Sequence, residues 1–207
     1  LWFPQSELNG DVSQYCWEDN VRVELTSTGL VANSPGVQTF VKDFGSTNFV
    51  AQGYMDTFIK AIEAIGYKEN QHLFGAAYDF RKICSPDELQ YYCSNLKQLI
   101  ERSVRYNGKP AVLVGHSLGS NIANYFLVNQ TDEWKRTYIN SFVSFSGAFG
   151  GCPKALRTLL SGMDNVSPKE ILKTVVRNFT GLQWMLPVPE LYKDIPLVHL
   201  NNTSYYA

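Results

Sequence analysis

The chain lacks the features that would favour a nucleic-acid-binding or membrane-spanning protein. Its 207 residues include 18 basic and 19 acidic side chains, for a formal net charge of −1 and without a long run of one sign. We therefore expect no nucleic acid partner. No apolar run approaches the ~18 residues of a membrane span, and the opening Leu-Trp-Phe-Pro does not resemble a signal peptide. Any membrane contact is expected to be peripheral. Because the charges are balanced, we expect a neutral or apolar partner.

Cysteine is scarce, and its spacing argues against metal chemistry. The four cysteines are Cys16, Cys84, Cys93 and Cys152, without Cys-x-x-Cys spacing. A zinc or thioredoxin-type site is therefore not expected. Cys84 and Cys93 flank the start of a predicted helix that would separate them by about 13 Å, too far for a disulfide. We expect no metal ion and no cofactor.

The composition is that of a folded protein with a substantial core. Hydrophobic residues make up 44% of the chain and aromatic residues 14%, enough for one large domain or one domain with an appendage. Five Asn-x-Ser/Thr sequons are compatible with the secretory pathway, with a secreted, lysosomal or vacuolar location. They begin at Asn129, Asn165, Asn178, Asn201 and Asn202.

The strongest chemical signal lies in residues 109–125. A short run of β-forming residues ends in Gly-His-Ser-Leu-Gly at 115–119 and continues directly into a helical pattern. This context predicts a strand, a sharp turn and a helix, with the hydroxyl of Ser117 exposed in a strained backbone conformation. The alternative is an ordinary serine in a tight turn.

The neighbours of Ser117 are small, as close approach of a strand and a helix requires. They are Gly115, Gly119 and Ser120. We therefore interpret Ser117 as a nucleophile.

Helix and strand patterns alternate through the middle of the chain. Residues 1–50 predict loops and short strands, with one alternating segment at 21–25 and a turn at Pro35-Gly36. The later elements are expected at 54–65 (helix), 73–77 (strand), 85–107 (helix), 111–114 (strand), 118–129 (helix) and 139–145 (strand). This order predicts an α/β protein with a mostly parallel sheet covered on both faces.

Two later segments leave alternatives open. The loop at 146–151 follows a strand at the expected carboxyl edge of the sheet, where it could bind a ligand or be a plain flexible loop. A capping box at 167–170 opens a helix with one apolar side. Its periodicity favours an ordinary core-facing helix, whereas its position after the predicted catalytic strands favours a mobile apolar lid, to which the residues at 184–187 would add a bulky apolar patch.

Several motifs in order carry a family resemblance over almost the whole chain. They are Cys16–Val23, Gly29–Val37, Ala76–Arg81, Gly115–Gly119, Trp134–Ile139, Leu159–Gly162 and His199–Thr203. Together they resemble the lecithin:cholesterol acyltransferase family, which includes lysosomal phospholipase A and the phospholipid:diacylglycerol acyltransferases. The chain departs from that pattern where Ala77, Phe80, Ala148 and Phe149 replace Pro, Trp, Pro and Trp.

The resemblance implies an α/β-hydrolase fold with cap and lid insertions. It implies a cap or membrane-proximal segment at 1–50, a catalytic core at 51–165 and a lid or cap region at 166–207. The family's catalytic Asp and His, its N-terminal oxyanion loop and the partner of Cys16 fall outside the matched motifs. We therefore expect a partial chain that lacks the first strands and the last third.

The expected mechanism is acyl transfer through a serine ester. Ser117 would be the nucleophile, and the backbone N–H of Leu118 would donate to the oxyanion. Within the chain, the triad order Ser, Asp, His is met only by Asp132, Asp164 or Asp194 with His199. We favour structural roles for His72, for His116 and for an ion pair between Asp79 and Arg81.

The resemblance also implies a lipid substrate at a membrane or lipoprotein surface. Trp184, Met185 and Phe149 are the expected substrate-binding residues. An acyl group would pass from a glycerophospholipid, or from a neutral lipid, to Ser117 and then to water or a lipid alcohol. The alternatives are a generic serine carboxylesterase and a truncated, inactive lipid-binding paralogue. The sequence leaves the oligomeric state open.

Overall fold

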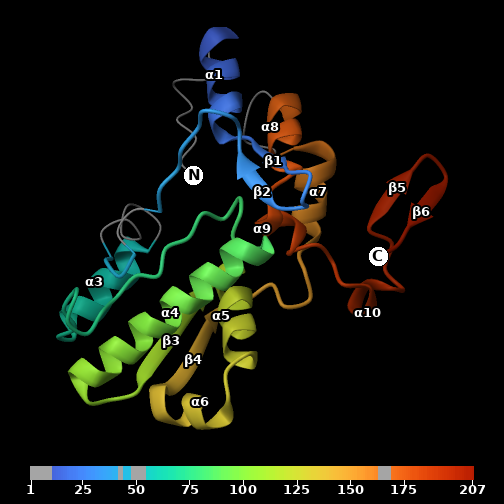
Figure 1. Cartoon of the computed structure of the whole chain (residues 1–207). Helices are drawn as coiled ribbons and strands as arrows, with labels where there is room; N and C mark the ends of the chain where they lie inside the picture. Colours follow the sequence, from blue (N-terminus) through green and yellow to red (C-terminus); the bar gives the residue numbers. More distant parts are fainter. Residues whose placement is uncertain (1–10, 42–43, 48–54, 163–168) are drawn as a thin grey trace. The chain divides into compact units, whose positions relative to one another are not determined.

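The computed structural model describes residues 11–41, 44–47, 55–162 and 169–207 (Figure 1). The chain divides into two compact units. We call residues 39–79 and 87–147 the elbow unit, and residues 1–38, 80–86 and 148–207 the terminal unit. Tyr54, Asp164, Asn165 and the Ser167-Pro168 start of the predicted capping box lie outside the described residues.

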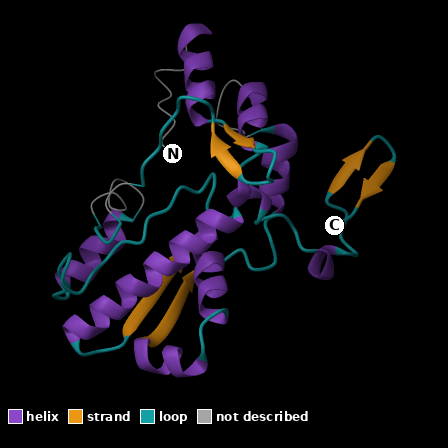
Figure 2. Cartoon of the chain, viewed as in Figure 1, coloured by secondary structure: helices purple, strands orange, loops and turns teal. Residues whose placement is uncertain are grey.

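The described chain contains both helices and short strands (Figure 2). They are α1 Asp11–Val21, β1 Val23–Leu25, β2 Val31–Asn33, α3 Asp56–Ala64, α4 Pro86–Asn107, β3 Ala111–His116, α5 Leu118–Val128, α6 Asp132–Tyr138, β4 Ile139–Phe145, α7 Pro153–Ser161, α8 Lys169–Val176, α9 Thr180–Gln183, α10 Pro189–Tyr192, β5 Val198–Leu200 and β6 Thr203–Tyr205. The protein is therefore of the α/β class.

The elbow unit is built on the parallel pair β3 and β4. Alternation along β3 turns Ala111 and Leu113 toward a core shared with α4, α5 and α6. That core contains Leu96, Ile100, Phe126 and Trp134. The opposite face leaves Val112, Val114, Val143 and Phe145 exposed, and Phe58 of α3 lies edge-on to Phe145 with ring centroids 5.8 Å apart. The sequence predicted helices over both faces of the sheet. Among the described residues, helices fully cover only one face of the β3–β4 pair.

Most predicted elements of this unit are confirmed. The helices at α3, α4 and α5 and the strands β3 and β4 lie where the periodicity placed them. The helix α3 ends as expected at Gly66, which has a φ of +101° and donates its N–H to the Glu63 carbonyl. These elements are long and strongly patterned, so local sequence was sufficient to locate them.

Two expectations about secondary structure were wrong. Residues 73–77 form no strand beyond an isolated bridge between Glu69 and Leu73. Gly75, Ala76 and Ala77 make this segment a poor strand former, despite its apolar character. Residues 11–21, expected to be loops and short strands, form the helix α1, whose apolar residues make only a weak stripe.

The terminal unit has its own core around the antiparallel hairpin β1–β2. Val23 and Val31 of the hairpin pack with Val175, Val176 and Phe179 from α8 and the turn after it. The expected turn at Pro35-Gly36 is present, with φ +82° at Gly36 and a hydrogen bond from the Val37 N–H to the Ser34 carbonyl. The burial of Val175, Val176 and Phe179 is the behaviour expected of a core-facing helix.

The segment 80–86 is tied into the terminal unit through Arg81. This side chain is buried, and its guanidinium donates to the Val21 carbonyl at 2.8 Å and to Asn33 Oδ1 at 3.3 Å. Arg81 therefore joins the end of α1 to β2, which is a structural role. Its predicted ion pair with Asp79 stays a prediction.

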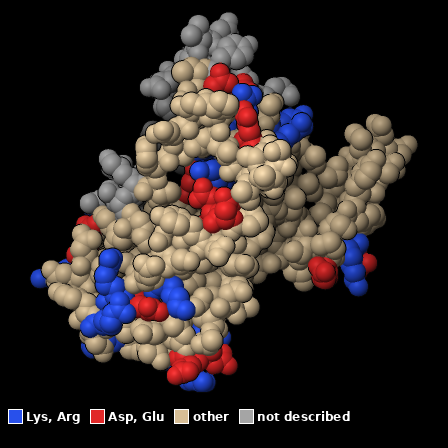
Figure 3. All heavy atoms as spheres, in the orientation of Figure 1, with Lys and Arg blue, Asp and Glu red and all other residues tan. Residues whose placement is uncertain are grey.

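Charged side chains of both signs are present on the face drawn in Figure 3. On the face shown in Figure 3, acidic and basic side chains lie in small neighbouring groups separated by uncharged surface. Within the described parts of the chain, no helix is both long and apolar enough to cross a bilayer.

Candidate active site

The turn between β3 and α5 holds Ser117 in an unusual backbone conformation. We call residues 115–120 the elbow. Ser117 has φ +50° and ψ −124°, a combination that costs a non-glycine residue about 1–3 kcal/mol. Its N–H donates to the Phe145 carbonyl at 2.9 Å, and its carbonyl accepts from the Ser120 N–H at 2.9 Å. Ser117 is half-buried, so it is neither packed inside the core nor in an ordinary helical turn.

Gly115 is required by the close approach of α5 to β3. A Cβ atom at this position would lie 2.7 Å from the Ser120 Cα and 2.9 Å from the Gly119 carbonyl oxygen, which are backbone atoms with little freedom to move. Ser120 is fully buried, and its hydroxyl has no hydrogen-bond partner among the described residues. Gly115 therefore has to be small, as expected, whereas the need for a small residue at Ser120 stays a prediction.

Gly119 is less constrained than expected. A Cβ atom there would meet Tyr78 Oη at 3.5 Å, an ordinary van der Waals contact. The expectation that Gly119 must be small for close strand–helix packing was therefore wrong, because this residue faces a side chain rather than the β3 backbone.

Leu118 is the first residue of α5, so its N–H has no acceptor within the helix. The helix N-terminus also favours negative charge. Because the Leu118 side chain is buried, its backbone is held firmly at this position. A negatively charged oxygen close to Ser117 could therefore accept a hydrogen bond from Leu118.

Two tyrosines beside the elbow were not singled out from the sequence. Tyr78 lies next to Gly119, and its ring is edge-on to Tyr92 with centroids 5.5 Å apart. Tyr92 is anchored by donating to the Ala76 carbonyl at 3.0 Å, and its burial raises the pKa of its hydroxyl. Tyr78 belongs to the Ala76–Arg81 motif, so this motif was the sequence feature that could have pointed to a tyrosine beside the elbow.

The three expected substrate-binding residues lie in the terminal unit. Phe149 is 52% exposed and Trp184 is 37% exposed. The Cys152 N–H donates to the Met185 carbonyl at 2.7 Å, and the Val188 N–H donates to the Gly150 carbonyl at 3.1 Å. The structure thus brings the loop of Phe149 against the segment of Met185, while Ser117 and Leu118 belong to the elbow unit.

The other titratable candidates make local contacts. His199 Nδ1 lies 3.0 Å from Ser204 Oγ in the β5–β6 hairpin, and Asp132 Oδ1 lies 2.8 Å from Lys135 Nζ in α6. Neither contact is a Ser-His-Asp relay. Asp194 is exposed in the turn before β5, and Asp164 lies outside the described residues.

The remaining two histidines are held within the elbow unit. His72 Nδ1 accepts from the Lys68 N–H at 3.2 Å, which closes a loop and fits the expected structural role. His116 is the last residue of β3, on the same face as Val112 and Val114.

Cys84 and Cys93 are poor candidates for a competing nucleophile. All four are free thiols in the structure, as expected for Cys84 and Cys93. Burial raises the pKa of Cys84 to about 12 and also raises that of Cys93, which keeps both thiols neutral and unreactive at neutral pH. The described residues contain no cluster of three or more His, Cys, Asp or Glu that could hold a metal ion.

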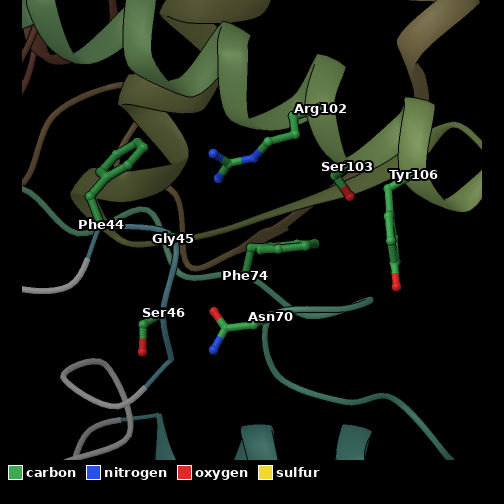
Figure 4. Close-up of a pocket in the computed structure, with 8 residues that line it drawn as sticks. All are labelled: Phe44, Gly45, Ser46, Asn70, Phe74, Arg102, Ser103 and Tyr106. Carbon is green, nitrogen blue, oxygen red and sulfur yellow. The ribbon is translucent and has the colours of Figure 1, made fainter.

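Two hollows are lined by residues outside the elbow. One of about 440 Å³ lies beside α4, with Arg102 and Tyr106 on one side, Ser46 and Asn70 on the other and Phe74 between them (Figure 4). The other, of about 670 Å³, lies between α7 and β5 and includes His199. Neither is lined by the elbow, so their shape adds nothing to the chemistry of Ser117.

Comparison with known proteins gives a consistent match. The family model described as lecithin:cholesterol acyltransferase matches residues 1–203. Phosphatidylcholine-sterol acyltransferase of Mus musculus is 35% identical over 202 residues, covering 92% of this chain and 46% of the relative.

Two further relatives agree with that match. Lysosomal phospholipase A and acyltransferase of Bos taurus is 34% identical over 185 residues, covering 83% of this chain and 45% of the relative. Lecithin-cholesterol acyltransferase-like 1 of Arabidopsis thaliana is 34% identical over 230 residues, covering 100% of this chain and 53% of the relative. The chain spans about half the length of the curated relatives it matches.

Proposed function

This chain belongs to the lecithin:cholesterol acyltransferase family, and on that premise we propose that it supplies the nucleophile of a serine-dependent lipid acyltransferase or phospholipase A. The observation that carries the proposal is Ser117, held at φ +50° between the end of β3 and the first turn of α5. Strained residues cluster at functional sites, and this one lies beside a helix N-terminus, which favours negative charge. The complete catalytic domain is an α/β-hydrolase fold, with β3 and β4 as two neighbouring strands of its sheet.

In the proposed reaction, Ser117 Oγ attacks the carbonyl carbon of an acyl ester. A histidine takes the hydroxyl proton, and the carbonyl π electrons move to the oxygen, which accepts from the Leu118 N–H. A donor of this kind contributes about 3–4 kcal/mol to transition-state stability. Collapse of the intermediate breaks the ester C–O bond, and the histidine returns the proton to the leaving lipid alcohol.

The acyl-serine is then resolved by water or by a second lipid alcohol, with the same histidine acting first as base and then as acid. In this proposal the histidine, its orienting aspartate and the second oxyanion donor come from segments of the whole protein beyond these 207 residues. The local contacts of His199 and Asp132 support that assignment, because each already has a neighbour with no part in a relay.

The proposed acyl donor is a glycerophospholipid at a membrane or lipoprotein surface. Relatives carry the names phosphatidylcholine-sterol acyltransferase and lysosomal phospholipase A and acyltransferase. The exposed rings of Phe149 and Trp184, together with Met185, would contact acyl chains. We assign residues 1–50 to a cap or membrane-proximal segment, 51–165 to the core and 166–207 to a lid or cap, in a protein of the secretory, lysosomal or vacuolar lumen.

The nucleophile is tested by labelling the full-length protein with a fluorophosphonate, which phosphonylates activated serines. We expect Ser117→Ala to abolish labelling. Ser146→Ala is the matched control, because Ser146 also has φ +50° and follows the neighbouring strand. Labelling that survives in Ser117→Ala, or is lost in Ser146→Ala, contradicts the assignment.

The acyl acceptor is tested with phosphatidylcholine vesicles, with and without a sterol or a long-chain alcohol. Free fatty acid alone indicates a phospholipase, whereas an acylated sterol or alcohol indicates transfer. Faster turnover of soluble short-chain esters than of vesicle phospholipid would instead favour a generic carboxylesterase. All of these products should disappear in Ser117→Ala.

A further inference from the structure

The sequons differ in the surroundings of their asparagine side chains. Asn165 lies outside the described residues, and Asn201 and Asn202 occupy the exposed β5–β6 turn, where the family resemblance already includes a sequon. The informative pair is Asn129 and Asn178. Both are exposed residues followed two positions later by threonine, yet their amide nitrogens have different surroundings.

Asn129 lies at the surface, at the end of α5. It is the C-cap residue of that helix, and its Nδ2 donates to the exposed Tyr125 carbonyl one turn earlier, at 2.8 Å. An amide nitrogen carries two hydrogens, and this contact, like the one that Asn178 makes, uses one of them; at Asn129 the contact lies in exposed surroundings. Thr131, which completes the sequon, caps α6 by accepting from the Trp134 N–H at 3.2 Å and is exposed.

Asn178 has its amide nitrogen turned into the fold. Its Nδ2 donates to the Val23 carbonyl at 3.1 Å, and Val23 is a fully buried residue of the terminal unit's core. The threonine of this sequon, Thr180, is buried; its hydroxyl donates to the Arg81 carbonyl and accepts from the Cys84 N–H. A bulky group on Asn178 would have to displace this packed arrangement.

We propose that Asn129 is an N-glycosylation site and that Asn178 is not. In the modification, Asn129 Nδ2 attacks the anomeric carbon of a lipid-pyrophosphate-linked oligosaccharide. The new N–C bond replaces the C–O bond to the pyrophosphate, which leaves with its lipid, and the amide gives up one proton. The proposal rests on passage through the secretory pathway and is independent of the acyl-transfer chemistry.

The position of Asn129 suits a permanent glycan. Ser117 and Asn129 are the residues that flank α5 at its two ends, about 18 Å apart for 12 steps of ~1.5 Å, so the point of attachment lies away from the elbow. The same end of α5 exposes Tyr125 and Val128, the latter 71% exposed. A hydrated oligosaccharide here shields an apolar part of the surface.

The test is site-resolved mass spectrometry of the full-length protein secreted by a eukaryotic host. Glycans are released enzymatically in ¹⁸O water, which marks each formerly occupied asparagine as labelled aspartate. We expect the label at Asn129 and none at Asn178. An unlabelled Asn129 overturns the proposed site, and a labelled Asn178 overturns the selection by the fold.

A gel assay with matched variants gives an independent readout. Asn129→Gln should lose the mobility step of one glycan, whereas Asn124→Gln should keep it, because Asn124 is exposed on the same helix but is followed by Tyr-Phe. Unchanged mobility of Asn129→Gln contradicts the proposal. Fluorophosphonate labelling of Asn129→Gln should remain, so failure of the glycan site and failure of the proposed nucleophile are distinguishable.

Discussion

Two neighbouring strands of the elbow unit end in the same way but continue differently. The residues Gly115-His116 pair in register with Ser144-Phe145, so Ser117 and Ser146 follow equivalent positions of β3 and β4. Both serines have φ +50°. Ser117 leads directly into α5, whereas no helix begins after Ser146 until α7 at Pro153. Backbone strain alone therefore does not distinguish a candidate nucleophile.

The difference lies in the helix that follows the first serine. Because α5 turns back over β3, the residue two positions before Ser117 can only be glycine, while the equivalent position before Ser146 is an exposed serine. The helix also places the unpaired N–H of Leu118 beside Ser117. What separates the two turns is a helix N-terminus next to a strained serine. The predictions on Gly115, Ser117 and Ser146 test that distinction, and the later ones test the packing and charge of the neighbouring helices.

The largest effect is expected from Gly115→Ser, which gives β3 the residue found at the same register in β4. Its Cβ would lie 2.7 Å from the Ser120 Cα, and forced overpacking against backbone should cost about 3 kcal/mol. For a chain of this size, this loss of stability should lower the melting temperature by about 10 °C, which thermal unfolding would measure.

Two controls accompany this variant. Gly119→Ala should be neutral or stabilising by up to about 1 kcal/mol, because the added methyl group meets only Tyr78 Oη at 3.5 Å in a helix that favours alanine. Ser144→Gly should cost less than about 1 kcal/mol. Equal effects of Gly115→Ser and Gly119→Ala would show that α5 does not press on β3 at Gly115.

A smaller effect is expected when each strained serine becomes glycine. Ser117→Gly and Ser146→Gly should both stabilise the fold by about 1 kcal/mol, because glycine adopts φ +50° without steric cost and this outweighs its larger unfolded-state entropy. Only Ser117→Gly should also lose fluorophosphonate labelling. Denaturant unfolding measures the stability of each variant. A gain in stability for only one of the two glycine variants would show that the two turns are not equally strained.

Removing the hydroxyl of Tyr92 should change the stability by a similar amount. Tyr92→Phe removes the hydrogen bond to the Ala76 carbonyl and leaves a poorly solvated acceptor, at a cost of about 1 kcal/mol. Tyr91→Phe is the matched control, because Tyr91 is the preceding residue of α4 and is 68% exposed. A loss of stability in Tyr91→Phe as large as in Tyr92→Phe would contradict the buried anchor.

Because the pKa of Tyr92 is raised, we expect the stability of the fold to fall at alkaline pH. Burial raises the pKa of Tyr92 above its ordinary value of 10.0, so the folded protein binds the phenolic proton more tightly than the unfolded chain does. This contribution is complete below pH 10 and is lost as the pH rises further. Stability measured above pH 10 should therefore fall less steeply in Tyr92→Phe than in the parent protein.

The elbow could be predicted from the sequence because its determinants are local. The apolar run, the glycine before Ser117 and the helical pattern after it are contiguous, and β4 was located at 139–145 for the same reason. The strand expected at 73–77 failed because apolar character was weighed above the weak strand preference of glycine and alanine. The helix α6 was missed, although Thr131 caps it and acidic residues fill its first turn.

The contacts of the site could not be predicted in this way. The register that sets Ser117 beside Ser146, and the approach of Tyr78 to Gly119, join segments far apart in the chain. No spacing rule separates Gly115, which faces backbone, from Gly119, which faces a side chain. Similarly, both Asn129 and Asn178 match one sequon pattern, and only the fold distinguishes their amide nitrogens.

The smallest effect is expected from a substitution in α6. This helix leads from the end of α5 toward β4 and so links the two strands compared above. Lys135 holds the pKa of Asp132 below its ordinary value of 3.8, so this carboxylate favours the folded state above that pH and loses its contribution as the pH falls through the lowered pKa. Both side chains are accessible to water, which weakens the pair. Asp132→Asn should therefore lower the melting temperature slightly at pH 7 and not at all in strong acid. An undiminished difference in acid would assign the loss to packing of α6 rather than to charge.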